Sequence, residues 1–149
     1  MDKSLLKRSY TAAALAAAGI TAAVIIYAVI AEALRRGGFR PVLLPPAAYA
    51  VKYALYVLGA AALPLLRLAG RLDVKKAGPE ETVRNLVLLA IMRAALAEVP
   101  ALCGLMLVIL TGGYSDFYLL LAFAAGLEIY YFPRLSAWEE RLRGDFGEL

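Results

Sequence analysis

One apolar run in the middle of the chain limits the folds that the sequence can adopt. The run extends from Leu86 to Leu110, and a helix of this length crosses the hydrocarbon core of a bilayer, which takes about 20 residues. Two ionisable residues interrupt it, Arg93 and, at its centre, Glu98. An ionisable residue at bilayer depth is costly and is typically paired or functional. The run therefore predicts a transmembrane helix in which Glu98 is the most informative residue.

Three further apolar runs accompany this one, separated by charged segments that contain glycine or proline. The composition agrees, because 62% of the residues are hydrophobic and 19% are charged, whereas a soluble domain is about one quarter charged. We expect a single all-α integral membrane domain with four transmembrane helices arranged as antiparallel hairpins. The expected spans are residues 10–34, 46–68, 86–110 and 114–132.

The C-terminal tail, residues 134–149, alternates apolar and charged positions instead of forming a further apolar run. Leu135, Trp138 and Leu142 fall on one face of a helix, with charged residues opposite. This pattern predicts a short C-terminal interfacial helix that lies at the membrane surface.

The basic residues are distributed unevenly between the two sides of this arrangement. Most of them lie in the N-terminal segment, in the connection between the second and third spans, and in the tail, whereas the opposite side holds Arg35, Arg36 and Arg40. The positive-inside rule then predicts a multi-pass protein of the cell (inner) membrane with both termini in the cytoplasm. Because the basic residues flank spans, we expect them to meet lipid headgroups and expect no nucleic-acid partner.

The residue types that are missing limit the chemistry. The chain has no histidine and one cysteine, Cys103, so protein-held haem, iron–sulfur and zinc sites lack ligands, and a histidine-activated nucleophile cannot form. No polar cluster converges in the sequence as a catalytic pocket requires. We therefore expect no metal, no cofactor and no enzymatic activity.

Four charged residues near the span ends suggest two ion pairs. Arg93 lies about 10 Å from the cytoplasmic end of the third span. Glu128 lies about four residues from the same end of the fourth, so the two can pair across the hairpin. Snorkelling of both side chains to the interface is an equally open alternative. Lys52 and Glu32 occupy matching depths on the opposite side and form the second candidate pair.

Glu98 is too deep to snorkel, because it lies about 18 Å from either end of its span. It is either protonated, or it has a partner or a water within the bundle. Two interpretations remain open: a hydrogen-bonded structural group, or a reversible proton or cation site. Small residues recur beside it in a rhythm that favours close helix packing. They are Ala90, Ala94, Ala97, Ala101 and Gly104.

The segment from Gly78 to Leu110 resembles the second helix of the proteolipid, or c, subunit of rotary ATP synthases. That family has a cytoplasmic Pro-Glu step followed by an apolar helix with an ion-carrying carboxylate, and here Pro79-Glu80 precedes the Ala95-Leu96-x-Glu98 step and the Gly104-Leu105 pair. The resemblance implies that Glu98 is a proton- or sodium-binding carboxylate. The chain departs from the family in lacking a Gly-x-Gly repeat in the preceding span, in carrying Arg93, and in its two additional spans.

The sequence thus favours a small polytopic membrane subunit, proteolipid-like or accessory to a larger membrane complex. Its expected partners are the lipid bilayer and either further copies of itself or other membrane subunits. The alternative is a subunit that translocates protons or sodium ions with Glu98 as the ion-binding carboxylate.

Overall fold

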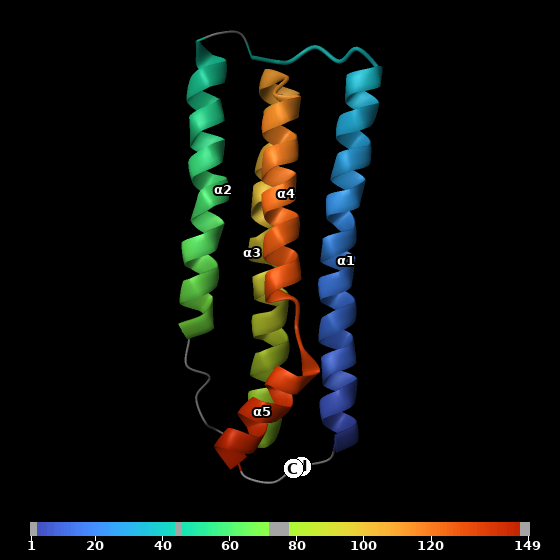
Figure 1. Cartoon of the computed structure of the whole chain (residues 1–149), viewed down its shortest axis with the longest axis vertical. Helices are drawn as coiled ribbons and strands as arrows, with labels where there is room; N and C mark the ends of the chain where they lie inside the picture. Colours follow the sequence, from blue (N-terminus) through green and yellow to red (C-terminus); the bar gives the residue numbers. More distant parts are fainter. Residues whose placement is uncertain (1–2, 44–45, 72–77, 147–149) are drawn as a thin grey trace.

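A computed structural model of the protein describes residues 3–43, 46–71 and 78–146. Within these ranges the secondary structure is helical, which confirms the all-α class. Four long helices lie side by side and a shorter fifth lies across one end of the bundle (Figure 1). They are α1 (Lys3–Arg36), α2 (Ala47–Arg71), α3 (Pro79–Thr111), α4 (Tyr114–Tyr131) and α5 (Leu135–Phe146).

Successive long helices run in opposite directions (Figure 1). The first residues of α1, the start of α3 and all of α5 lie at one end of the bundle, which we call the inner end. The α1–α2 connection and the α3–α4 turn lie at the other, the outer end. Helices α3 and α4 form the expected antiparallel hairpin. Helices α1 and α2 do not, because α3 and α4 lie between them.

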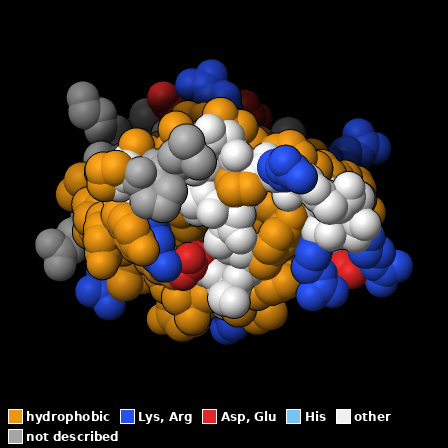
Figure 2. Space-filling model, turned by 90° about the horizontal axis from the view of Figure 1, so that it is seen from above, with side chains coloured by type: hydrophobic (Ala, Val, Ile, Leu, Met, Phe, Trp, Pro, Cys, Tyr) orange, Lys and Arg blue, Asp and Glu red, His pale blue; other side chains and the backbone are white. Residues whose placement is uncertain are grey.

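Three helical segments are long and apolar enough to cross a membrane: Leu6–Arg36, Ala47–Ala69 and Pro79–Thr111. Helix α4 lies close to the expected fourth span, but it is shorter and carries Asp116 and Glu128 near its two ends. Apolar side chains surround the bundle when it is viewed from the outer end (Figure 2). This exposed apolar surface fits a lipid environment, since a soluble monomer rarely exposes large apolar patches.

Helix α3 is the centre of the bundle, because it packs against each of the other four helices. Four of the five small residues singled out above are buried, namely Ala90, Ala97, Ala101 and Gly104, and Ala94 is half-buried. Gly104 permits the closest approach: a Cβ atom there would lie 3.1 Å from Cδ2 and 3.2 Å from the carbonyl oxygen of Phe117 on α4.

The ends of α3 are defined by local sequence. Pro79 opens the helix, where its missing N–H costs nothing, and Glu80 and Glu81 follow in the first turn, where carboxylates favour the helix dipole. Gly112 ends it with φ of 72°, a left-handed conformation that favours glycine. The last carbonyls are then satisfied by the α1–α2 connection, whose Val42 and Leu43 N–H groups donate to Ile109 (3.3 Å) and Leu110 (2.9 Å).

The C-terminal helix packs differently from the prediction. The tail does form a helix, α5, but Trp138 and Leu142 are buried against α1 and α3, in a cluster with Leu6 and Leu86. The apolar face that we expected to meet lipid therefore contacts protein. The physical reason is that α1 and α3 extend past the end of α4 and leave apolar surface for α5 to cover (Figure 1).

Candidate functional site: a carboxyl centre between α1, α3 and α4

Glu98 has a partner inside the bundle. It lies half-buried on α3, and the hydroxyl of Tyr27 on α1 donates a hydrogen bond to its Oε1. Tyr27 is held there because α1 turns one apolar stripe toward α3, in which Ala17, Val24 and Ala31 are buried. The structure thus gives Glu98 a hydrogen-bond partner within the bundle. This bond is compatible with a structural group and with a reversible proton site, so both interpretations stay open.

Glu128 is the more unusual acid. Only 4% of the residue is exposed, and neither carboxyl oxygen has a hydrogen-bond partner among the residues that the structure describes. Thr21 on α1 is its polar neighbour, but the single hydroxyl hydrogen of Thr21 is donated to the Ala17 carbonyl at 3.1 Å. Thr21 therefore has no hydroxyl hydrogen left to donate to a Glu128 carboxylate.

The two acids are close enough to influence each other electrostatically. Glu128 interacts electrostatically with both Glu98 and Tyr27, so polar side chains of three helices influence one another in an otherwise apolar bundle. We call Thr21, Tyr27, Glu98 and Glu128 the carboxyl centre. Sequence reasoning found the two acids but placed them in separate roles. Tyr27 could have been identified from the sequence, because it lies deep within an apolar run and a buried tyrosine hydroxyl needs a hydrogen-bond partner.

A small cavity adjoins the carboxyl centre on its inner side. Its volume is about 10 Å³, the space of about one water molecule. Glu128 and Thr21 line it together with small residues and with the chain just after α4. The other lining residues are Ala17, Ala94, Ala97, Tyr131, Phe132 and Pro133.

The predicted pair between Arg93 and Glu128 does not form. The two residues lie at similar depth, but Glu128 points toward α1, whereas the Arg93 guanidinium lies over the ring of Tyr131, with its Cζ 5.9 Å from the ring centroid. Nε of Arg93 is buried without a hydrogen-bond partner in the described part of the chain. A similar depth does not bring the two side chains into contact, because they leave their helices in different directions.

The predicted pair between Lys52 and Glu32 does not form either. Nζ of Lys52 lies 2.7 Å from Oδ2 of Asp116 at the start of α4. Glu32 instead pairs with Nε of Arg35 (3.0 Å) and Nε of Arg36 (2.7 Å) on its own helix. The reason is the arrangement of the bundle, since α2 packs against α3 while α1 lies on its other side.

Asp116 joins α2 to α4 at the outer end. Besides Lys52, it accepts a hydrogen bond from the Tyr56 hydroxyl at 2.8 Å. Asp116 falls within the expected fourth span, residues 114–132, and the sequence predicted no partner for it. Within the described ranges, no group of three or more acidic or cysteine side chains gathers as a metal site.

We expect Asp116→Ala to lower the free energy of unfolding by about 1–2 kcal/mol. The change removes a charged acceptor from Lys52 and Tyr56, and hydrogen bonds to charged groups are worth about 1.5–3 kcal/mol, less where water competes. Thermal unfolding in detergent measures the effect. Ser115→Ala, at the exposed neighbouring position, is the control; equal stability of the two variants would contradict the assignment.

Comparison of the chain with protein-family models, with curated proteins and with solved structures found no match. The carboxyl centre and the apolar bundle around it therefore carry the functional argument.

Proposed function

We propose that the protein is a four-span integral membrane subunit, without enzymatic activity, whose carboxyl centre binds and releases a proton within the bundle. The observation that carries this proposal is Glu128, a carboxyl group that is 4% exposed and lacks a hydrogen-bond partner among the described residues. It interacts electrostatically with both members of the Tyr27–Glu98 pair. A buried charge without partners is very costly, whereas a neutral carboxyl group costs much less. At least one proton in the centre removes that cost.

Three features support the membrane part of the proposal. Three helical segments are long and apolar enough to span, and α4 packs along α3 as the fourth. The inner end carries most of the basic residues, including Arg84, Arg134 and Arg143, so we place it on the cytoplasmic side. The large exposed apolar surface suits packing against lipid, further copies of the chain or other membrane subunits.

The proton is favoured over a metal cation by the chemistry of the centre. A sodium or divalent cation takes several oxygen ligands at short distance. Here Oε1 of Glu98 is engaged by Tyr27, and Thr21 is bonded to its own helix. The resemblance to the rotary proteolipid subunit gave Glu98 the ion-carrying role; in the proposal, Glu98 and Glu128 share it.

Carbodiimide labelling tests the proposal, because carbodiimides react with protonated carboxyl groups in apolar surroundings. The full chain in lipid vesicles is treated over a range of pH, and the modified residues are identified by mass spectrometry. We expect labelling at Glu128 or Glu98 that declines as the pH rises. Glu128→Gln and Glu98→Gln should each remove their own label.

Glu32 supplies the internal control, because it pairs with two arginines at the outer end and should stay unlabelled. Proton uptake by vesicles under an imposed membrane potential then distinguishes the two expected roles. Proton uptake that is abolished by Glu98→Gln supports translocation. Vesicles that take up no protons, with a protein whose labelling still depends on pH, support an accessory subunit. If neither acid is labelled at any pH at which the protein is folded, the proposal fails.

We expect Tyr27→Phe to destabilise the protein by about 1–2 kcal/mol, because Glu98 then loses its donor in a partly dry site. The matched control is Tyr53→Phe, since Tyr53 is 67% exposed on α2. Thermal unfolding in detergent compares the two. A Tyr27→Phe protein as stable as the Tyr53→Phe protein would show that the hydrogen bond contributes nothing.

A further inference from the structure

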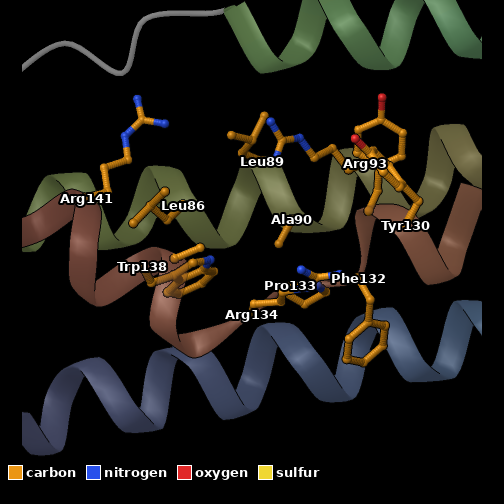
Figure 3. Close-up of a pocket in the computed structure, with 12 residues that line it drawn as sticks. Leu86, Leu89, Ala90, Arg93, Tyr130, Phe132, Pro133, Arg134, Trp138 and Arg141 are labelled. Atoms are coloured by element: carbon orange, nitrogen blue, oxygen red, sulfur yellow. The ribbon is translucent and has the colours of Figure 1, made fainter.

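A crevice of about 390 Å³ opens at the inner end, beside the carboxyl centre but separate from it. Its walls come from α3, from the last residues of α4 and from α5 (Figure 3). Three arginines line it: Arg93 from α3, Arg134 from the α4–α5 connection and Arg141 from α5. The remaining lining is largely apolar and aromatic, and it includes Leu89 and Trp138.

Among the described residues, nothing offsets the positive charge of the crevice. Its lining contains no acidic residue, and none of the three arginines forms an ion pair within the described ranges. Arg93 and Arg141 repel each other electrostatically, and their guanidinium groups lie on the same side of α3, flanking Leu89 (Figure 3). Like charges held together at the edge of an apolar bundle are unfavourable unless an anion lies between them.

The chemistry of the lining identifies the kind of anion. Guanidinium groups match phosphate oxygens with paired, charge-assisted hydrogen bonds. Nε of Arg93 has no protein acceptor in the described part of the chain, so this guanidinium is not engaged by a carboxylate or carbonyl. The volume of the crevice exceeds that of a bare phosphate and leaves space for the groups esterified to it.

The position of the crevice points to a lipid as the source of that phosphate. Tyr130 lines the crevice and is also 73% exposed on the side of the bundle, where Ile129 beside it is 74% exposed. An acyl chain can therefore continue from the crevice along the apolar surface. Arg93 lies about 10 Å into the apolar run of α3, a depth that its long side chain spans toward the headgroup region.

We propose that this crevice binds the phosphate of an anionic phospholipid headgroup between Arg93 and Arg141, with Arg134 on the opposite wall. Basic pockets at the cytoplasmic ends of transmembrane helices are a recurrent form of lipid recognition. The site would fix a specific lipid where α3, α4 and α5 meet. It does not depend on proton binding at the carboxyl centre.

The chain carries its own reporter for this site, because Trp138 lines the crevice and is the single tryptophan in the sequence. Phosphatidylglycerol with brominated acyl chains is titrated against the full-length protein in phosphatidylcholine vesicles, and quenching of Trp138 fluorescence is followed. We expect saturable quenching. Brominated phosphatidylcholine should quench more weakly, and inorganic phosphate should not displace the anionic lipid.

The decisive comparison uses two arginines of the same helix. Arg141 lines the crevice, whereas Arg143 is exposed and does not, yet Arg141→Gln and Arg143→Gln change the net charge equally. We expect Arg141→Gln to weaken lipid binding about tenfold and Arg143→Gln to leave it nearly unchanged. Arg93→Gln should also weaken it about tenfold, and Arg93→Lys tests the same position with the charge retained.

Three results would overturn the proposal. If Arg141→Gln and Arg143→Gln weaken lipid binding equally, the lipid is attracted by the overall charge of the protein and not by the crevice. If the anionic and zwitterionic lipids quench Trp138 fluorescence equally, the crevice does not recognise the anionic headgroup. Displacement of the lipid by inorganic phosphate would assign the crevice to a soluble phosphate compound instead. Because Arg141 lies at the end of the bundle, its variant remains informative even if Arg93→Gln fails to fold.

Discussion

Replacing Gly104 by leucine is expected to lower the free energy of unfolding by about 3 kcal/mol, the upper part of the range for overpacking. The first atom of the new side chain would lie 3.1 Å from Cδ2 of Phe117 and 3.2 Å from its backbone oxygen. A backbone oxygen cannot rotate away as a flexible side chain can. Helices α3 and α4 must therefore separate, and Phe117, which is fully buried, loses its packing.

Cys103 offers a direct measurement, because it is the single cysteine of the chain and is 4% exposed. A thiol-reactive dye added in detergent reports the temperature at which the bundle opens. Gly126→Leu is the matched control: a Cβ atom there would meet nothing within 4 Å, and leucine favours a helix over glycine by almost 1 kcal/mol. We expect this control to unfold no earlier than the native protein. Equal loss in both variants would show that α3 and α4 do not pack through Gly104.

The second large effect has the opposite sign: Glu128→Met is expected to stabilise the protein by about 1–3 kcal/mol. Burying a polar group without a partner costs about this much, and an apolar side chain of similar size avoids the cost. Residues that serve a function at the expense of stability show this behaviour. The same variant should abolish the carbodiimide label at position 128.

Glu98→Met is the control for this prediction. It leaves the Tyr27 hydroxyl without its acceptor in the bundle, so we expect a loss of stability of about 1 kcal/mol. Opposite signs for the two acids would match the structure, in which one carboxyl is satisfied and the other is not. If Glu128→Met destabilises instead, Glu128 is part of the structural framework, and the proton-binding proposal loses its main support.

The positions of the helices could be predicted from sequence because the length of an apolar run, together with glycine and proline at its ends, sets where a span begins and ends. The central run did become the central helix, and Pro79 and Gly112 bound it. The sequence also predicts a deep position for Glu98, because depth in a span follows from position along the helix.

The partners of the charged residues could not be predicted, because they depend on how each helix is rotated about its axis. A helix turns by about 100° per residue, so a small difference in rotation changes which neighbour a side chain meets. Arg93 and Glu128 share a depth but face different helices, and Lys52 meets Asp116 because α2 packs toward α4. The apolar face of α5 was ambiguous for another reason: Trp138 and Leu142 suit a lipid surface and a protein surface equally well.

In the membrane arrangement that we propose, the unequal lengths of the helices determine how the bundle meets the bilayer. Helix α4 has 18 residues, whereas α1 and α3 have 34 and 33, which correspond to about 27 Å and about 50 Å. A hydrocarbon core of about 30 Å matches α4 but not its neighbours. The apolar runs of α1 and α3, expected at residues 10–34 and 86–110, are also longer than that core, which favours a tilted bundle and a locally thinned leaflet at the inner end, where α4 stops. Such thinning would bring water closer to Glu128 from the inner side alone.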